Sequence, residues 1–528
     1  MATGGGGLFR EKALVLRTTA RGRWRSFASV RVGDARGFGR HCLFQMPDLP
    51  PVTVVGAGPT GALVALLLAK RGYSIQVYEY RDDPRQKKAS TKKASDFADL
   101  GSTALAKVAD AAKRSINLTL SHRGLSGLKR AGIDTKALEL AVPVRGRMIH
   151  GKDGSITLQP YDPDPNKVMH SVGRESINGW LLEQLAEYEA SGMVKLHFGY
   201  KCVRVKADGS ADFEKISDKS VHSSGPGKLL GCDGTFSKVR AEMARISRLS
   251  VSIEYIEHGY KELAIKSKPC KEGDTCTAGG KGATHAMPAE GLHIWPGSET
   301  NQTMLIALPN ADGSFTCTLF GEFAFLESLK TEEAVRAFFA STWPDSLELM
   351  PDLPAQYLRN PNAALSTVRC SPWHLNGNLL LLGDAAHGVV PFYGQGMNCA
   401  FEDCLLLDDA LTEHNDVWDK TLPSFSVSRK RATDALAKLA IDNYEEMRDK
   451  TVDNLFLLKC KLHEALHSVL GETWQPSLHS AVTFTSMPYD KARSTFEWQD
   501  AMLVRAGVAV GGLLAVGVAA GLARAVRK

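Results

Sequence analysis

The sequence has few cysteines close to one another, and the nearest two, Cys399 and Cys404, are separated by four residues. Its ten cysteines are spread from Cys42 to Cys460 without a CxxC pair, so neither a zinc-ligand spacing nor a disulfide framework is visible. Scattered cysteines of this kind are typical of a reducing compartment, where thiols stay unpaired. We therefore expect no bound metal and predict buried, unpaired cysteines.

Acidic residues are scarce at the N-terminus. Among the first 45 residues, Glu11 and Asp34 alone oppose nine lysines and arginines. The net charge of the whole chain is +6, so the rest is nearly neutral and no nucleic-acid-binding surface is predicted. An Arg-rich, acid-poor segment over residues 1–48 is typical of an organelle transit peptide. A disordered extension, or a true start at Met46, fits the same residues.

One long segment lacks charge altogether. Residues 506–523 read AGVAVGGLLAVGVAAGLA, and Arg505 and Arg524 flank them. As a helix this run spans roughly 27 Å, close to the hydrocarbon thickness of a bilayer, and flanking arginines are suited to lipid headgroups. We predict a membrane helix over residues 502–524. The alternative is a terminal helix packed on the core, since five glycines weaken the run.

The motif GAGPTG lies between a predicted strand, Val52 to Val55, and an apolar helix that runs to about Lys70. Its glycines are Gly56, Gly58 and Gly61. They suit a tight turn, a close approach to a pyrophosphate, and strand–helix packing, respectively. Thr60 opens the helix, whose N-terminus favours phosphate. Glu79 closes the second strand, where a carboxylate accepts hydrogen bonds from a ribose diol, and Arg81 can cover the adenine side.

A second stretch favours FAD over NAD at this site. Four leucines, Leu379 to Leu382, predict a buried strand, and Asp384 follows at its end. A buried carboxylate needs a partner, and the ribityl chain of a flavin offers a hydroxyl group. A helix beginning near Gly396 to Asn398 would point its positive end at the flavin ring. His387 in the same stretch is interpreted as a packing or hydrogen-bonding residue.

Several longer segments make the chain similar to one family. They include RSINLTLSHRGLSGLKRAGI (Arg114 to Ile133), PVRGRMIHGKDG (Pro143 to Gly154), SVGRESIN (Ser171 to Asn178), HGYKEL, LHIWPG, MLIALPNADGSFTCTLF, GDAAHGVVPFYGQGMNCAFEDC and NYEEMR. From about Val52 onward the chain resembles the kynurenine 3-monooxygenases, a family of flavin-dependent aromatic hydroxylases. SINLTLSHRG and NYEEMR are the most specific of these segments, because other flavin hydroxylases lack them.

The resemblance implies an α/β fold with a Rossmann-like FAD-binding domain, a mixed-sheet substrate domain, a C-terminal helical region and a transmembrane helix. The expected boundaries are 49–140, 171–250 and 365–420 for the FAD domain, with a Lys/Ala-rich insertion at 82–113, then 141–170 and 251–364 for the substrate domain, 421–499 for the helical region and 502–524 for the membrane helix. Residues 1–48 are left as an extension.

The resemblance also implies the reaction. NADPH would reduce FAD, and O2 would then give a C4a-hydroperoxyflavin that hydroxylates L-kynurenine to 3-hydroxykynurenine. No side chain is expected to act as a catalytic group, because the flavin performs the chemistry. The family sits in the mitochondrial outer membrane through its C-terminal tail, with the catalytic part facing the cytosol. An Arg-rich N-terminal segment such as residues 1–48 is unusual in a protein that is anchored by its C-terminal tail.

The resemblance assigns binding residues position by position. Those for the substrate are Arg147, Tyr161, Asn443 and His479, of which His479 stands where the family usually has Tyr. Those for the flavin, beyond the three glycines, are Thr60, Glu79, Arg81, Thr119, Arg174, Asp384, Gly396, Met397 and Asn398. Two alternatives stay open: a flavin hydroxylase for another aromatic acid, and a non-catalytic flavoprotein tethered to a membrane.

Overall fold

The computed structural model describes residues 49–86, 117–271, 276, 282–297, 302–450, 454–475 and 477–506. The predicted N-terminal extension, most of the insertion at 82–113, and residues 507–524 of the predicted membrane helix lie outside these ranges. Within them, no helix is long and apolar enough to cross a membrane.

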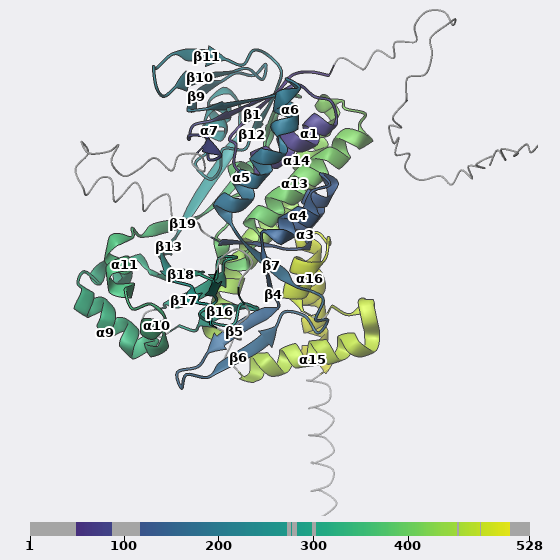
Figure 1. Cartoon of the computed structure of the whole chain (residues 1–528). Coiled ribbons are helices and arrows are strands. Elements are labelled where there is room, and N and C mark those ends of the chain that lie inside the picture. Colours follow the sequence, from purple (N-terminus) through teal and green to yellow (C-terminus); the bar gives the residue numbers. More distant parts are fainter. Residues whose placement is uncertain are drawn as a thin grey trace, which may run out of the picture. The chain divides into compact units, whose positions relative to one another are not determined.

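The first sheet has six strands, five of them parallel (Figure 1). Their order is β20 (His374–Leu375), β21 (Leu379–Leu381), β12 (Lys228–Gly231), β1 (Val52–Val55), β2 (Ile75–Glu79) and β8 (Val194–Phe198), with β20 antiparallel. Parallel strands buried on both faces consist of nearly continuous apolar residues, and β1 and β21 are fully buried. Helix α1 (Pro59–Lys70) follows β1, and Pro59 suits its first position.

The second sheet is mixed and has seven strands. Their order is β19 (Ala363–Ser371), β13 (Ser250–Ile265), β18 (Phe315–Glu322), β17 (Met304–Pro309), β16 (Gly291–Trp295), β5 (Gly146–His150) and β6 (Ile156–Pro160). Most of β18 alternates between buried and half-buried residues, as expected when one face packs on a core. Val335 and Phe339 of helix α9 (Glu332–Thr342) pack in the same core as Phe315 and Leu319 of β18.

Smaller elements complete the described fold. The remaining strands are β3 (Asn117–Leu120), β7 (Met169–Gly173) and β4 (Val142–Val144) in one sheet, β9 (Tyr200–Val205), β10 (Ala211–Lys215) and β11 (Val221–Ser223) in another, and the pair β14 (Lys268–Pro269) and β15 (Ala283–Thr284). The remaining helices before residue 391 are α3 (His122–Arg130), α4 (Asp134–Glu139), α5 (Arg174–Gln184), α6 (Ala186–Ala190), α7 (Lys238–Ile246), α8 (Phe323–Ser328), α10 (Pro344–Leu349), α11 (Leu353–Arg359) and α12 (Asp384–His387).

Helices α13 and α14 run between the two sheets, and further helices follow them (Figure 1). The bounds of these helices are α13 (Gly396–Glu413), α14 (Trp418–Glu445), α15 (Asn454–Leu470), the short α16 (Leu478–Phe484) and a last helix over residues 489–506. Phe425 of α14 joins the core of the first sheet, whereas Tyr444 packs in a separate core beside the second sheet. At Glu446–Lys450 the helix widens into a π-turn, a feature that is frequent at functional sites.

The α/β fold with a mixed second sheet and C-terminal helices is confirmed, whereas the domain boundaries stay a prediction. The prediction of unpaired cysteines was wrong for one pair, because Cys270 and Cys276 form a disulfide. Cys270 follows β14, and the pairing of β14 with β15 turns this segment back on itself. A six-residue spacing falls outside a search for CxxC pairs. The seven other described cysteines are free, and six of them are buried. The disulfide removes support for the inference of a reducing compartment.

Candidate flavin and substrate site

The dinucleotide motif has the geometry that each glycine predicts. Gly56 has a φ of +101°, and a Cβ there would lie 2.5 Å from the carbonyl oxygen of Cys232. A Cβ on Gly61 would lie 1.9 Å from the oxygen of Gly56, so both positions require glycine. A Cβ on Gly58 would meet nothing within 4 Å, so this glycine faces open space. The first N–H groups of α1 have no intrahelical partner and suit a phosphate there.

Glu79 lies directly beside this motif at the end of β2. Its Oε2 accepts a hydrogen bond from the N–H of Ala57 at 2.8 Å, and its Oε1 accepts one from Arg81 Nε at 2.8 Å. Burial raises the pKa of Glu79, but the bonds and charge of Arg81 outweigh this and leave it lowered. The carboxylate is therefore ionised and held in place. Arg81 engages this carboxylate here, and the adenine-side role stays a prediction.

The loop around Asp384 approaches the motif from another part of the chain. Both β1 and β21 are parallel to the intervening β12, so their carboxyl ends meet at one edge of the sheet. A Cβ on Gly383 would lie 3.0 Å from Thr60 Oγ1. Asp384 is half-buried, and its carboxylate has no hydrogen-bond partner in the described part of the chain. An unpartnered carboxylate and an open glycine face at one sheet edge fit a bound dinucleotide.

Asn398 and Thr119 hold the loop before α13 rather than presenting free side chains. Asn398 Nδ2 donates to the carbonyl oxygens of Thr119 (2.7 Å) and Gly394 (2.9 Å), and its Oδ1 accepts from the N–H of Ser121 at 2.8 Å. Thr119 Oγ1 donates to Gly394 O at 3.0 Å. Any contact of Asn398 with a flavin would therefore use its backbone N–H, at the positive end of α13.

Three further predicted flavin residues differ in their surroundings. A Cβ added at Gly396 would have Val389 as its nearest neighbour, at 3.9 Å, so there is space beside this glycine. The adjacent Met397 is half-buried. Arg174 is exposed at the first position of α5. Burial raises the pKa of Tyr260, and the charge of Arg174 partly offsets that rise, so these two side chains are close. In the described ranges, Arg174 forms no hydrogen bond to another predicted flavin residue.

Arg147 is the centre of the predicted substrate site. It lies on β5 and is buried, with Nη1 donating to Glu446 Oε1 at 3.0 Å and Nη2 donating to Asn443 Oδ1 at 3.3 Å. Burial lowers the pKa of this guanidinium, but Glu446 more than reverses the effect, so Arg147 is charged. Its Nε is buried without a partner in the described structure.

Two further predicted residues form an aromatic stack beside it. The ring centroids of Tyr161 and His479 are 4.7 Å apart, and the ring planes are tilted by 23°. Tyr393 also stacks on His479, with the ring centroids 5.5 Å apart. Tyr161 Oη and His479 Nδ1 are buried and unpaired within the described ranges. Burial, together with the charge of Arg147, lowers the pKa of His479 well below its usual value, so its imidazole is neutral. The structure thus brings Arg147, Tyr161, Asn443 and His479 together.

Sequence reasoning missed three residues of this site. Glu446 pairs with Arg147, Tyr393 stacks on His479, and Gln395 is buried with its Nε2 unpaired among the described residues. The signals were present: Glu446 follows Asn443 by three residues in NYEEMR, and Tyr393 and Gln395 flank a glycine in PFYGQG. Residues three apart on a helix share a face, so the carboxylate could have been placed beside the amide.

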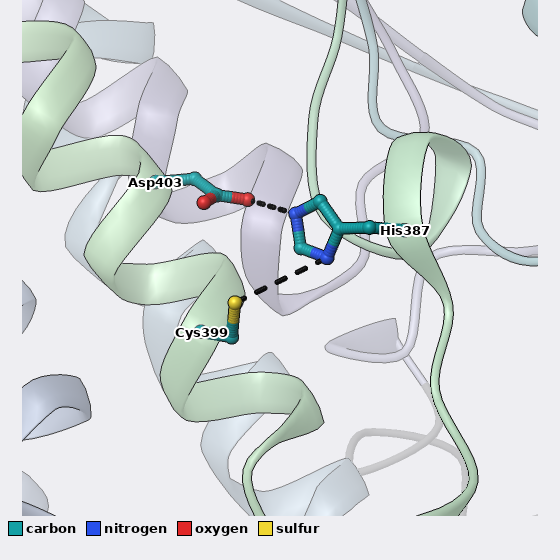
Figure 2. Close-up of side chains that lie close together, drawn as sticks. All are labelled: His387, Cys399 and Asp403. Carbon is teal, nitrogen blue, oxygen red and sulfur yellow. Dashed lines mark hydrogen bonds and ion pairs between the residues drawn. The ribbon is translucent and has the colours of Figure 1, made fainter. Parts of the chain in front are cut away.

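A buried ion cluster includes side chains from the first half of α13. Figure 2 shows His387 Nε2 against Asp403 Oδ2, at 2.6 Å, with Cys399 Sγ 4.0 Å from His387 Nδ1. Burial lowers the pKa of His387, but Asp403 reverses this and raises it well above its usual value. His387, Cys399 and Asp403 have a spacing that could suit a metal ion. Arg429 already supplies a positive charge there, with Nε 2.7 Å from Asp403 Oδ1 and Nη2 3.1 Å from Cys399 Sγ.

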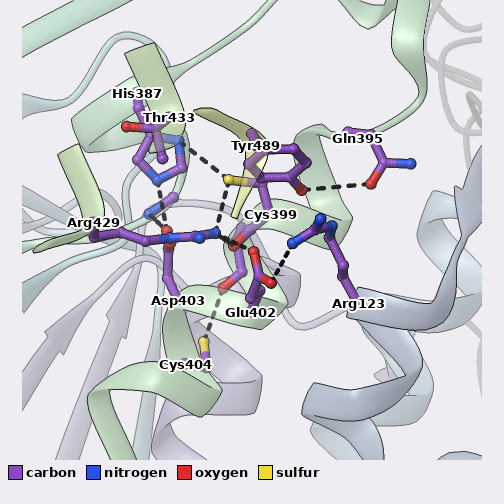
Figure 3. A network of polar contacts seen from close by, with 12 residues as sticks. Arg123, His387, Gln395, Cys399, Glu402, Asp403, Cys404, Arg429, Thr433 and Tyr489 are labelled. Carbon is purple, nitrogen blue, oxygen red and sulfur yellow. Dashed lines mark hydrogen bonds and ion pairs between the residues drawn. The ribbon is translucent and has the colours of Figure 1, made fainter. Parts of the chain in front are cut away.

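The cluster extends to the last helix (Figure 3). Arg429 and Arg123 both pair with Glu402, each at 2.6 Å. The ring of Tyr489 lies 4.1 Å from the Arg123 guanidinium, and its hydroxyl donates to Gln395 Oε1 at 3.5 Å. Paired buried charges fix geometry, since breaking one pair leaves an uncompensated charge. These contacts therefore fix α13, whose first turn borders the flavin loop.

Comparison with known proteins agrees with this geometry. The model of the FAD binding domain family matches residues 50–438. The kynurenine 3-monooxygenase of Dictyostelium discoideum is 38% identical over 459 residues, 84% of this chain and 90% of the relative. Those of Anopheles gambiae and Sus scrofa are 36% and 35% identical over 471 and 467 residues, each 88% of this chain and 89% and 90% of the relative. The chain belongs to the kynurenine 3-monooxygenase family.

Solved structures with a similar fold are more distant in sequence. Pseudomonas aeruginosa PqsL in complex with 2-aminobenzoylacetate has a TM-score of 0.55 at 18% identity, covering 76% of this chain and 97% of that one. The 2-methyl-3-hydroxypyridine-5-carboxylic acid oxygenase has a TM-score of 0.54 at 16% identity, over 78% and 95%. They support the fold alone. Membership of the kynurenine 3-monooxygenase family makes the protein a flavoprotein monooxygenase with FAD as its cofactor.

Proposed function

We propose that the protein uses FAD, NADPH and O2 to hydroxylate L-kynurenine beside its ring amino group, giving 3-hydroxykynurenine. The observation that carries this proposal is the set of unpaired buried atoms around one position: Arg147 Nε, Tyr161 Oη and His479 Nδ1. Leaving a buried polar group unpaired costs about 1–3 kcal/mol. A polar ligand at this position would remove the cost at all three atoms.

The amino-acid end of kynurenine matches the charges of this site. Its carboxylate offers two coplanar oxygens to the Arg147 fork, with the Tyr161 hydroxyl as a further donor. In the structure, Glu446 binds one of these donor nitrogens, Arg147 Nη1, and the Glu446 side chain is 30% exposed. A substrate carboxylate would displace Glu446 from Arg147, and the freed carboxylate would then face the substrate ammonium. Asn443 Oδ1 offers a second acceptor for the same ammonium.

The aromatic end would lie among apolar and neutral groups. Phe392 stacks on Tyr444 at 4.1 Å and lies 4.9 Å from Phe320. His479, being neutral, adds no charge to this wall. Bound FAD supplies the redox chemistry, namely reduction by NADPH and activation of O2. The side chains of this protein orient the ring, exclude water and hold the charged end in place.

The decisive experiment is incubation of the purified, FAD-loaded protein with NADPH, air and L-kynurenine, followed by mass analysis. We expect 3-hydroxykynurenine and kynurenine-stimulated oxidation of NADPH. The second candidate is hydroxylation of another aromatic acid, and the observation favouring it is His479, where Tyr is usual. A panel of aromatic acids tests this: faster turnover of another acid, with no product from kynurenine, would replace the first proposal.

We further propose that residues 502–524 anchor the protein in a membrane. The support is the uncharged run over 506–523 and its flanking Arg505 and Arg524. A chain stopped after Arg505 should lose its carbonate-resistant association with membranes and keep its FAD. Retention of that association by the shortened chain would place the anchor elsewhere.

For the location we propose the mitochondrial outer membrane, with the catalytic part facing the cytosol. The proposal rests on the family resemblance and on the uncharged run over residues 506–523 with its flanking arginines. In isolated mitochondria, added protease should digest the catalytic part without rupture of the outer membrane. Protection of the catalytic part until both membranes are opened would instead indicate import through the Arg-rich N-terminus.

A further inference from the structure

Helix α15 exposes apolar side chains along one face. Leu458, Leu462 and Val469 are 63%, 47% and 80% exposed. Together with the exposed Ala465 they are spaced four, three and four residues apart, which places them in one stripe along the helix. An amphipathic helix of a soluble protein normally turns such a stripe toward the core. We call these four residues the α15 stripe.

Polar contacts hold the opposite side of α15 against the protein. His463 is buried and stacks on Phe496 at 4.8 Å, while its Nε2 lies 2.8 Å from Asp500 Oδ1. Lys459 forms an ion pair with the same aspartate. Trp474 Nε1 donates to His463 Nδ1 at 3.2 Å. The outward direction of the stripe is therefore fixed by specific contacts with the last helix and with Trp474.

The last helix adds exposed apolar residues on the face turned away from this contact. Trp498 and Met502 are 58% and 42% exposed, and they share one face at a spacing of four. Figure 1 shows α15 lying crosswise at the end of the C-terminal helices. The uncharged run begins at residue 506 of the same last helix. The stripe thus lies close to the point where the chain becomes continuously apolar.

The surrounding charges favour lipid as the occupant. The exposed Lys461 borders the stripe on one side, and Lys459, which pairs with Asp500, borders it on the other, whereas Glu464 lies on another face of α15. A helix with an apolar face bordered by lysines is typical of one that lies in a bilayer surface, and Trp is favoured at the same depth. We propose that α15 lies in the surface of a lipid bilayer, with its stripe among the acyl chains. This contact would fix the orientation of the catalytic part, beyond what a single tail could do.

The test uses the full-length, FAD-loaded protein with Cys42 and Cys460 changed to Ser. Leu462→Cys and Val469→Cys each receive an environment-sensitive nitrobenzoxadiazole label. Vesicles of phosphatidylcholine and phosphatidylserine are then added. We expect the emission of both labels to shift to the blue and rise several-fold, and brominated lipids to quench them.

Two matched positions serve as controls. Glu464→Cys lies on the same helix but off the stripe. Val221→Cys lies on β11, and the exposed fraction of Val221, 65%, falls between those of Leu462 and Val469. Labels at both positions should keep the emission of a water-exposed probe. The proposal is overturned if the protein does not bind vesicles, or binds them with the stripe labels still water-exposed. It is also overturned if the blue shift appears without vesicles and grows with protein concentration, which would identify a second copy as the occupant.

Discussion

Replacing Arg147 with Lys tests the substrate site most sharply. Arg147 donates through separate nitrogens to Glu446 and Asn443 and keeps a third, Nε, unpaired among the described residues. Lys preserves the charge but offers a single ammonium without the planar fork that matches a carboxylate. The change therefore isolates the geometry of binding from its electrostatics.

The magnitude follows from what each change removes. Losing one of two parallel charge-assisted bonds costs roughly 1.4 kcal/mol or more, which corresponds to at least a tenfold higher KM for kynurenine. Arg147→Ala removes the charge as well, and breaking a buried pair costs about 3–5 kcal/mol. We therefore expect Arg147→Ala to lower kcat/KM by more than a hundredfold. Stability should fall less than this, because Glu446 is partly exposed and can reach water.

The assay is kynurenine-dependent NADPH oxidation with product quantified by mass, alongside the FAD content of each variant. Arg145→Lys is the matched control, because Arg145 lies two residues earlier and is exposed, and among the described residues its side chain donates only to Pro165 O, at 3.3 Å. It should leave KM unchanged. In Arg147→Ala/Glu446→Gln the leftover carboxylate is neutralised, so stability should recover while KM stays high. A wild-type KM for folded, flavin-loaded Arg147→Ala would refute the assignment of this site.

Three other changes have equally definite outcomes. Asp384→Ala should weaken FAD binding by about 1.5–3 kcal/mol, because a charge-assisted bond to the flavin is lost; unchanged affinity in a flavin-fluorescence titration would remove Asp384 from the site. Arg429→Met should cost about 3–5 kcal/mol of unfolding free energy in urea, since Asp403 loses a buried partner, whereas Arg431→Met, at an exposed pair, should cost at most about 1 kcal/mol. Burial lowers the pKa of His293 to about 4, whereas the unfolded chain has a pKa of about 6.5 for this group. The unfolded chain therefore takes up the proton first as the pH falls. The free energy of unfolding should be unaffected above about pH 6.5 and should drop by roughly 3 kcal/mol as the pH approaches 4. His293→Gln should flatten this acid-side loss in urea titrations at pH 7 and 4.5, and an unchanged slope would assign it to other groups.

Local sequence was sufficient for features that depend on neighbouring residues. Gly56 and Gly61 of GAGPTG lie against backbone atoms and Gly58 faces open space, as their positions suggest, because a strand, a turn and a helix follow one another directly. The apolar run of β21 was readable in the same way. Their local pattern and their tertiary environment agree.

Features made by distant residues could not be read from pattern. The ion pair of Arg147 and Glu446 joins positions 299 residues apart, and no local signal selects that partner for a strand arginine. Asn398 was assigned to the flavin, yet its side chain binds three backbone groups. The stack of His479 on Tyr161 likewise depends on how α16 packs. Family resemblance supplied these positions, but only the structure supplies their contacts.

The strand order of the first sheet has a consequence for synthesis of the chain. Strand β1 pairs with β2 on one side but with β12 on the other, and β12 in turn pairs with β21. A ribosome therefore releases Val52–Val55 long before its second neighbour, Lys228–Gly231, exists, and the sheet closes only after Leu381. Asp384 emerges later still. The β-branched edge of β1 stays unpaired until Lys228–Gly231 is made, and the edge of β12 until Leu379–Leu381 is made. We therefore expect FAD to load only after Asp384 has left the ribosome, and chaperone dependence to fall on the unfinished chain.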